Sequence, residues 1–187
     1  MDILKYYKEN NSSTWISNNL LFDKKPIVLS SMQKEFIDNK HNNTIITSRR
    51  AGKTFAIMTN ALERLYREEN EHINIVTFSK NAAEDIFDNY FNKFTTKNKS
   101  ALNYNKQLMH IYNKKTGSDI KIHYPQPANI VRGTRTSFVY IDDYYEDKYS
   151  YSVFIDDSEY IKRTNQSFYN TYSKMCHSLI KQISSLY

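Results

Sequence analysis

The chain has 187 residues, of which 40% are hydrophobic and 14% aromatic, a composition that fits a folded globular protein large enough for a core. Its formal net charge of +6 allows a polyanionic partner such as nucleic acid, although a solvated basic surface explains the charge equally well. The single cysteine, Cys176, excludes an internal disulfide and a cysteine metal site. The sequence shows no secretory signal peptide and no apolar span of about 20 residues, so we expect a soluble intracellular protein.

The first segment, residues 1–25, is polar apart from a small apolar cluster, and it predicts an N-terminal helix or arm packed on a main sheet. Residues 26–29 predict a short extended segment, and Ser30 or Ser31 is expected to cap the helix that follows. Gln33 lies on that helix. Its amide carries both a donor and an acceptor, as reading the edge of an adenine requires, but on these residues alone a surface glutamine is the simpler interpretation.

A strand, a loop and a helix follow one another from residue 44. Residues 44–47 are a β-branched run typical of a short buried strand, and the loop after them reads Ser48-Arg49-Arg50-Ala51-Gly52-Lys53-Thr54. A loop ending in Gly-Lys-Thr between a strand and a helix is the setting of a phosphate-binding P-loop. The standard motif has a glycine at position 47, where this chain has Thr47. The alternative is an ordinary strand-to-helix turn with a solvated lysine.

Each residue of the Gly-Lys-Thr triplet has a role in a P-loop. Gly52 lets the backbone curl around an oxygen-rich group, and the amides after it point at a β-phosphate from the helix N-terminus. Lys53 can place its ammonium between β- and γ-phosphates, and the Thr54 hydroxyl can ligate Mg²⁺. Phosphate binding is therefore the favoured interpretation.

Helix, strand and helix are predicted next. Apolar residues at helical spacing run to about Glu69, and residues 73–78 form a second strand. Asn81 is expected to cap the following helix with Glu84 at its third position. The aromatic stripe of that helix, within residues 83–94, is interpreted as core rather than as a binding platform.

A β-hairpin follows a polar loop at residues 95–100. Residues 108–112 and 120–124 alternate apolar and polar side chains around a Lys-Lys-Thr-Gly-Ser turn at 114–118. At the other end of the chain, one apolar face runs from residue 164 to the C-terminus and predicts a helix in which Cys176 is a packing residue.

Residues 137–143 read Ser-Phe-Val-Tyr-Ile-Asp-Asp and follow a turn at Arg132-Gly133. Large apolar residues ending in acids predict a central parallel strand whose carboxylates emerge at the carboxyl edge of the sheet, where ligands bind in open α/β folds. Asp142 could hold Mg²⁺ through water, and Asp143 could orient the attacking water. The alternatives are a strand followed by an acidic turn, or a second segment with the same layout at residues 153–159.

Together these residues resemble the ATPase half of the large terminase subunit, the DNA-packaging motor of tailed phages and herpesviruses. The P-loop of that family reads Ser-Arg-x-x-Gly-Lys-Thr without the leading glycine, as Ser48, Arg49, Gly52, Lys53 and Thr54 do here. The family also has an upstream glutamine, as at Gln33, and a hairpin followed by Arg-Gly before its acidic strand, as at Arg132-Gly133. The resemblance covers residues 26–147.

The resemblance implies an α/β fold of the P-loop NTPase class (ASCE/RecA-like), with a mostly parallel sheet flanked by helices and an inserted β-hairpin. It implies one P-loop ATPase-like domain over residues 1–187, with an arm at 1–25, a nucleotide-binding core at 26–147, and an acidic turn and C-terminal helix at 148–187. ATP would be bound by the upstream glutamine and the whole loop, namely Gln33, Ser48, Arg49, Arg50, Ala51, Gly52, Lys53 and Thr54.

The implied activity is ATP hydrolysis with Mg²⁺, the metal being held by Thr54 and Asp142. Catalysis would rest on Lys53, Asp143 and Arg49, the last because a guanidinium can fork across two γ-phosphate oxygens as charge develops. The implied partners are double-stranded DNA, the portal or other packaging subunits and a separately encoded nuclease, with no membrane. The implied location is the cytoplasm of the infected host cell and, transiently, the viral procapsid.

Three departures from the family pattern open alternatives. Asp143 stands where the family has a glutamate, which is one methylene longer, and no convincing coupling motif with a Thr- or Ser-bearing strand end follows it. The nuclease domain of the family is also absent from these 187 residues. One alternative is a degenerate P-loop protein that binds nucleotide, DNA or a packaging partner without turnover. The other is a helicase-type P-loop ATPase, which uses the same glutamine, loop and acidic strand.

Overall fold

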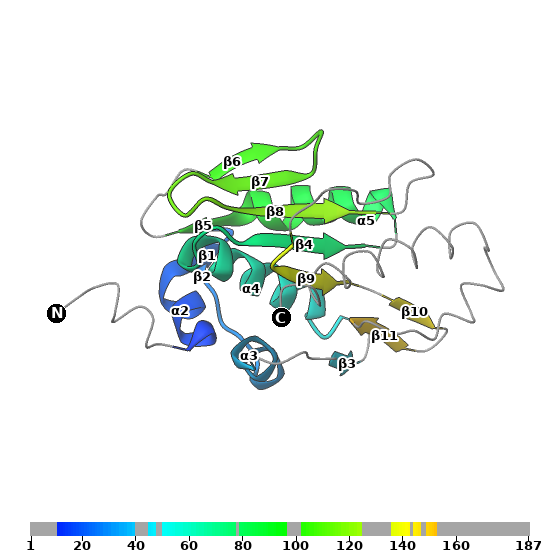
Figure 1. The fold of residues 1–187 in the computed structure, drawn as a ribbon. Helices are drawn as coiled ribbons and strands as arrows, with labels where there is room; N and C mark the ends of the chain where they lie inside the picture. Colours follow the sequence, from blue (N-terminus) through cyan, green and yellow to red (C-terminus); the bar gives the residue numbers. More distant parts are fainter. Residues whose placement is uncertain are drawn as a thin grey trace.

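The computed structural model of the chain is shown as a ribbon in Figure 1. It describes residues 11–39, 45–47, 50–77, 79–96, 102–124, 136–142, 144–146 and 149–152, with the backbone alone for 45–47, 144–146 and 149–152. Several sequence predictions therefore lie outside the described residues, among them the Arg132-Gly133 turn, the second acidic segment at 153–159, and the C-terminal helix from residue 164 with Cys176.

The largest sheet has five strands in the order β6-β7-β8-β4-β9. Its strands are β6 (Leu102–Asn105), β7 (His110–Asn113), β8 (Ser118–His123), β4 (His72–Val76) and β9 (Phe138–Ile141). β4 lies between β8 and β9 and pairs in parallel with both. The predicted second strand, the predicted hairpin and the predicted parallel acidic strand are thus confirmed as β4, β7–β8 and β9.

Three details of the predicted sheet are wrong for the described strands. β6, β7 and β8 pair antiparallel, so the sheet is mixed rather than mostly parallel. The hairpin is not a separate insertion, because β8 is itself the parallel neighbour of β4. Among the described residues β9 pairs with β4 alone and lies at the sheet edge, whereas a central position was expected.

Two smaller sheets accompany the large one. The first has the order β2-β1-β5 and consists of β1 (Leu20–Phe22), β2 (Lys25–Pro26) and β5 (Phe94–Thr96), so strand structure begins where a polar loop was expected. The second has the order β10-β11-β3 and consists of β3 (Ile45–Thr47), β10 (Tyr144–Glu146) and β11 (Tyr149–Ser152). The predicted strand before the P-loop is therefore present as β3, paired antiparallel with β11.

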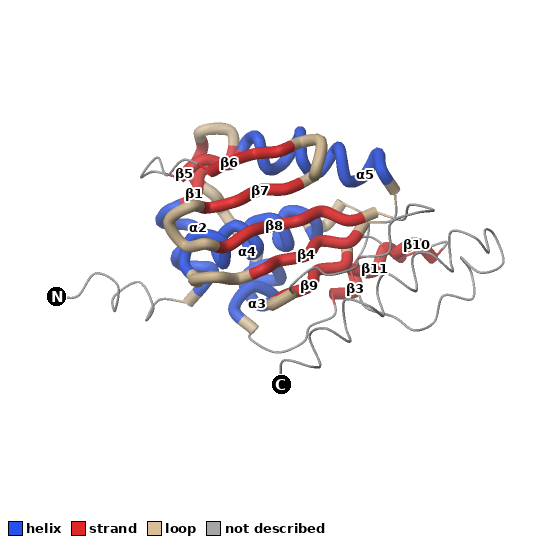
Figure 2. Tube along the Cα trace, turned by 45° about the horizontal axis from the view of Figure 1, so that its top comes forward, coloured by secondary structure: helices blue, strands red, loops and turns tan. Residues whose placement is uncertain are grey.

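One helix, α4 (Lys53–Arg67), runs along the five-stranded sheet and supplies much of the core. Its apolar residues Ala56, Ile57, Ala61, Leu62 and Leu65 are all buried, in one cluster with Ile73, Ile75, Ile111, Ile120 and Ile122 of the sheet. Figure 2 shows the sheet in front with α4 and its neighbouring helices behind it. The helical stripe predicted after the P-loop is confirmed, since an amphipathic helix gains stability by burying this face.

Strand register assigns the side chains to the two faces of this sheet. Phe138 and Tyr140 of β9 share a face with Ile73 and Ile75 of β4, and the Tyr140 hydroxyl bonds to α4. On the same face Phe87 contacts Tyr104 of β6 edge to face. The opposite face carries polar residues, namely His72, Asn74, His110, Asp119, Lys121 and His123.

The helix predicted near residue 81 is confirmed, but its cap is not Asn81. The segment consists of α5 (Lys80–Asp85), a π-helical turn η1 (Ile86–Tyr90) and a 3-10 turn η2 (Phe91–Lys93). Ser79 is the N-cap, because its hydroxyl accepts a hydrogen bond from the Ala82 amide at 3.1 Å. The aromatic stripe is core as expected, with Phe87, Phe91 and Phe94 buried.

The N-terminal segment contains α2 (Ser12–Asn19) and packs on helices rather than on the sheet. Its Ser13 bonds through both backbone and hydroxyl to the Asp38 carboxylate, at 2.7 and 2.6 Å, which ties it to α3 (Ser31–Asp38). Its Trp15 ring lies 6.3 Å from the Tyr66 ring of α4. Among the described residues, no helix combines the length and the apolar character that crossing a bilayer requires.

Candidate nucleotide-binding site

The candidate site lies where the loop before α4 turns into that helix. Arg50 and Gly52 both adopt positive φ, +64° and +81°, so the backbone curls sharply within three residues. Gly52 is the N-cap of α4. A helix that begins on glycine has no capping side chain over its first amides, and such helix starts bind anions through those amides and the helix dipole.

The missing glycine at position 47 has a structural explanation. Thr47 is the last residue of β3, where it pairs with Ser150 of β11. Extended backbone is open to every residue and suits a β-branched threonine well. The left-handed position that does require glycine is Gly52, which the chain retains.

The acidic strand reaches the start of α4 through one hydrogen bond. The Thr54 hydroxyl donates to the Asp142 carboxylate, with 3.1 Å between Oγ1 and Oδ1, although the two residues are 88 positions apart in the chain. Asp142 continues β9, because its amide donates to the Val76 carbonyl of β4 at 2.9 Å. The structure therefore brings together the two residues predicted to hold a metal.

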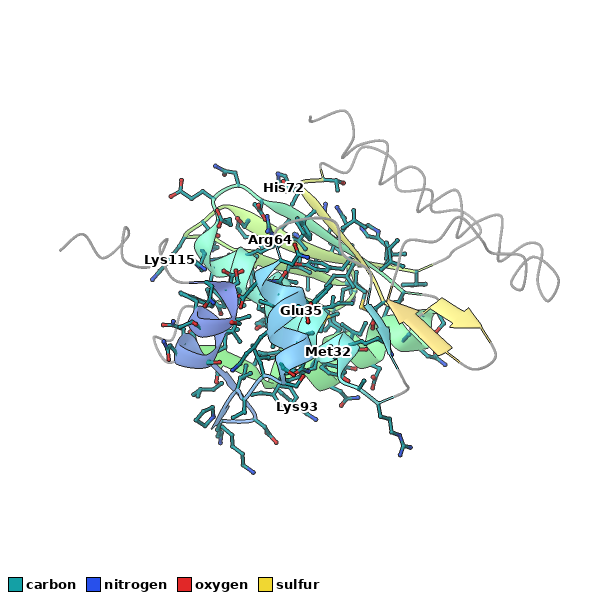
Figure 3. The ribbon with its side chains drawn as sticks, turned by 90° about the horizontal axis from the view of Figure 1, so that it is seen from below. Met32, Glu35, Arg64, His72, Lys93 and Lys115 are labelled. Atoms are coloured by element: carbon teal, nitrogen blue, oxygen red, sulfur yellow. The ribbon has the colours of Figure 1, made fainter. Side chains whose placement is uncertain are left out.

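Gln33 also reaches the loop before α4 and is 8% exposed, so it is not a surface glutamine. Its Nε2 donates to the Gly52 carbonyl at 3.0 Å, and its Oε1 accepts from the Ser30 amide at 2.9 Å. Ser30 is the N-cap of α3, and its hydroxyl accepts a hydrogen bond from the backbone amide of Gln33, which completes a capping box. In this geometry the side-chain amide of Gln33 links α3 to Gly52 at the start of α4; Figure 3 marks α3 by Met32 and Glu35.

The other predicted site residues differ in their surroundings. Lys53 is 5% exposed, which argues against a merely solvated lysine, whereas Arg50 is exposed and Ala51 is half-buried. Ser48, Arg49 and Asp143 lie outside the described residues. The structure thus brings together Gln33, Gly52, Thr54 and Asp142 of the predicted set.

The residues present fit Mg²⁺ in the manner typical of nucleotide sites. Mg²⁺ prefers hard oxygen ligands in an octahedron and uses one or two protein oxygens together with phosphates and water. Adjacent ligands of such an octahedron lie about 2.9 Å apart, close to the 3.1 Å between the Thr54 and Asp142 oxygens. Among the described residues no group of three His, Cys, Asp or Glu side chains could hold a metal.

Two sets of titratable side chains in the sheet lie apart from these contacts: His123, and Asp119 with its two histidine partners. Burial, together with the charge of Lys121, lowers the pKa of His123 to about 4, so this ring is neutral at pH 7 where it bonds to the Asn74 side chain. At the amino end of β4 and β8, the Asp119 carboxylate bonds to both His72 and His110. Figure 3 labels His72 near Arg64, which ion-pairs with Glu71 beside it.

Comparison with protein families shows which family the chain resembles. The family described as terminase large subunit, T4likevirus-type, N-terminal, matches residues 44–173, more than half of the chain. The chain belongs to this family. A search of curated proteins found no match. The matched residues include the loop at 48–54 and Asp142, whereas Gln33 lies before them.

Membership in the terminase large-subunit family assigns the chain to the proteins of viral DNA packaging. It confirms the resemblance seen in the sequence as far as the N-terminal part of a large terminase subunit. One contact near the site was not predicted, a hydrogen bond from Tyr140 of β9 to Asn60 of α4. A signal for it exists, since Asn60 is a lone amide on the sheet-facing stripe of α4.

Proposed function

We propose that this terminase domain binds ATP with Mg²⁺ and hydrolyses it to drive the packaging of viral double-stranded DNA. The observation that carries the proposal is the 3.1 Å hydrogen bond from the Thr54 hydroxyl to the Asp142 carboxylate. It joins the first turn of the P-loop helix to the end of the acidic strand. An ordinary strand-to-helix turn gives no reason for these two polar groups to meet.

The roles of the residues follow from their chemistry. The helix start after Gly52 would hold the β-phosphate, and Lys53 would balance the charge of the β- and γ-phosphates. Thr54 and Asp142 would hold the Mg²⁺ that neutralises charge on the phosphate oxygens. Asp143 would orient the attacking water, and Arg49 would contact the γ-phosphate as negative charge develops there.

Gln33 would support the nucleotide from the side of α3. Its amide is engaged with the Gly52 carbonyl and the Ser30 amide. An adenine contact would therefore add to, or exchange with, a contact that already shapes the P-loop. DNA, the portal and a separately encoded nuclease are the partners we propose for the working motor.

A second function is supported by one observation, the aspartate at position 143. The water-orienting group is one methylene shorter than the glutamate that terminases usually carry. A domain with this acid would bind nucleotide and packaging partners while turning over slowly or not at all.

ATP hydrolysis by the purified chain, with and without DNA, distinguishes these functions. Turnover with Mg²⁺ that disappears in Lys53→Ala supports the ATPase. Lys80→Ala is the matched control, since Lys80 also begins a helix but is exposed on α5. Absent turnover that appears in Asp143→Glu supports the nucleotide-binding alternative. If neither wild type nor Asp143→Glu hydrolyses ATP and a nucleotide analogue does not bind, both functions are refuted.

A further inference from the structure

Asn60 and Tyr140 form a buried polar pair between the P-loop helix and the acidic strand. The Tyr140 hydroxyl donates to Asn60 Oδ1, and the two residues are 5% and 8% exposed respectively. Ile57 of α4 and Ile75 of β4 belong to the buried core between the helix and the sheet, and the charged groups that act on Tyr140 are Arg64, Glu63 and Glu71.

The position of this pair relates it to the candidate metal site. Tyr140 precedes Asp142 by two residues on a strand, a distance of about 7 Å along the backbone. Asn60 follows Thr54 by six residues on α4, a rise of about 9 Å. The two hydrogen bonds, Thr54 to Asp142 and Tyr140 to Asn60, therefore join the same helix to the same strand at two neighbouring points.

Two points of attachment fix what one point leaves open. A helix that touches a strand at one polar contact can pivot about it or slide along the strand, because apolar contacts have no direction. A second hydrogen bond, which weakens steeply away from its preferred distance and angle, removes that freedom. Packing alone does not explain the pair, since replacing both partners with apolar groups of the same shape is often nearly neutral for stability.

We propose that the Asn60–Tyr140 hydrogen bond is a positioning contact that holds Thr54 and Asp142 at the separation needed to bind Mg²⁺ with the nucleotide. The proposal rests on the proposed nucleotide-binding function. Neither residue touches nucleotide or metal; both act through the placement of α4 against β9. Residues that orient metal ligands in this way typically change metal affinity or activity 10- to 100-fold when they are lost.

The test compares the binding of a non-hydrolysable ATP analogue in Mg²⁺ with its binding in EDTA. The variants are Tyr140→Phe and the double variant Tyr140→Phe/Asn60→Leu, in which leucine has nearly the shape of asparagine and leaves no buried polar group unpaired. The control is Thr116→Val, which removes the hydroxyl that donates to the Leu65 carbonyl at 2.9 Å and so loosens the other end of α4.

We expect both Tyr140 variants to bind the analogue in EDTA within about twofold of wild type and to lose roughly tenfold of the enhancement that Mg²⁺ gives. Thr116→Val should keep that enhancement. The double variant separates positioning from folding, because its core is satisfied but its second attachment point is gone.

Full Mg²⁺ enhancement in the double variant would overturn the positioning role while leaving nucleotide binding intact. Equal losses in Mg²⁺ and EDTA, or the same loss in Thr116→Val, would also overturn it, because they would show a general loosening of α4. If the wild-type chain binds no analogue, or if Lys53→Ala binds it as tightly as wild type, the proposed function itself is refuted and the positioning role with it.

Discussion

Replacing Gly52 with alanine tests whether the curled loop before α4 is a binding loop or only a helix start. The substitution acts on two features at once. Gly52 has φ +81°, and a Cβ built on it would stand 2.6 Å from Nε2 of Gln33. The first feature strains the backbone, and the second pushes away the side chain that bonds to the Gly52 carbonyl.

The expected cost follows from these two features. A left-handed conformation costs a residue with a Cβ about 1–2 kcal/mol. Displacing Gln33 removes its bonds to Gly52 and to the Ser30 amide, each with a net contribution of about 1 kcal/mol. Alanine regains roughly 0.4–1 kcal/mol by restricting the unfolded chain. We therefore expect the free energy of unfolding to fall by about 2–3.5 kcal/mol.

Gly117→Ala is the matched control. Gly117 has φ +72°, and its Cβ would stand 2.6 Å from Asn70 Oδ1, so the strain and the close approach are alike. It lies in the turn before β8, at the far end of α4, whose Glu68 carbonyl accepts from Ser118. The two variants should lose similar stability in urea unfolding, but only Gly52→Ala should weaken the binding of Mg²⁺ and an ATP analogue, by tenfold or more. Equal binding by both variants, measured where both are folded, would refute the assignment of this loop to phosphate.

Three further outcomes follow from the structure. The pKa of His123 is about 4 in the folded chain and about 6.5 in the unfolded chain, so between these pH values the unfolded chain binds one proton more. The free energy of unfolding should therefore fall by up to roughly 3 kcal/mol as the pH drops from 6.5 to 4. Urea titration should show a smaller fall in His123→Gln. Gln33→Glu keeps the acceptor for the Ser30 amide but turns a carboxylate toward the Gly52 carbonyl; calorimetry should show weaker nucleotide binding, and wild-type affinity would contradict the P-loop contact. Thr47→Gly restores the standard motif yet should lower stability by about 1 kcal/mol in thermal unfolding without raising nucleotide affinity, since residue 47 is in a strand.

The sequence predicted best what depends on neighbouring residues. The strand–loop–helix order around the P-loop, the Ser30 cap and the β7–β8 turn are all confirmed, because each is set by capping groups, glycine or side-chain alternation within a few residues. A local error, the cap of α5, arose between two good candidates two positions apart along the chain. Ser79 rather than Asn81 supplies the oxygen that bonds to the Ala82 amide.

Contacts between distant residues could not be predicted in the same way. Alternation of apolar residues shows that a segment is a strand, but not which strand lies beside it or in which direction, so the mixed sheet was expected to be mostly parallel. The same holds for α2, whose apolar cluster fits a helix layer as well as a sheet face. Its place beside α3 depends on the pairing of Ser13 with Asp38, which only the folded chain brings together.

The candidate site combines both kinds of information. Gly52, Lys53 and Thr54 belong to one short stretch and could be found from their order alone. The metal-binding acid had two candidate positions in the sequence, Asp142 and the acidic segment at 153–159. The hydrogen bond from Thr54 to Asp142 favours the first acidic segment, because a carboxylate must reach the start of α4 to bind the same metal ion as Thr54. The neighbouring Tyr140–Asn60 bond extends the same logic away from the phosphates. A strand that brings an acid to the start of α4 needs a second contact with that helix, since a single contact fixes a distance but not an orientation.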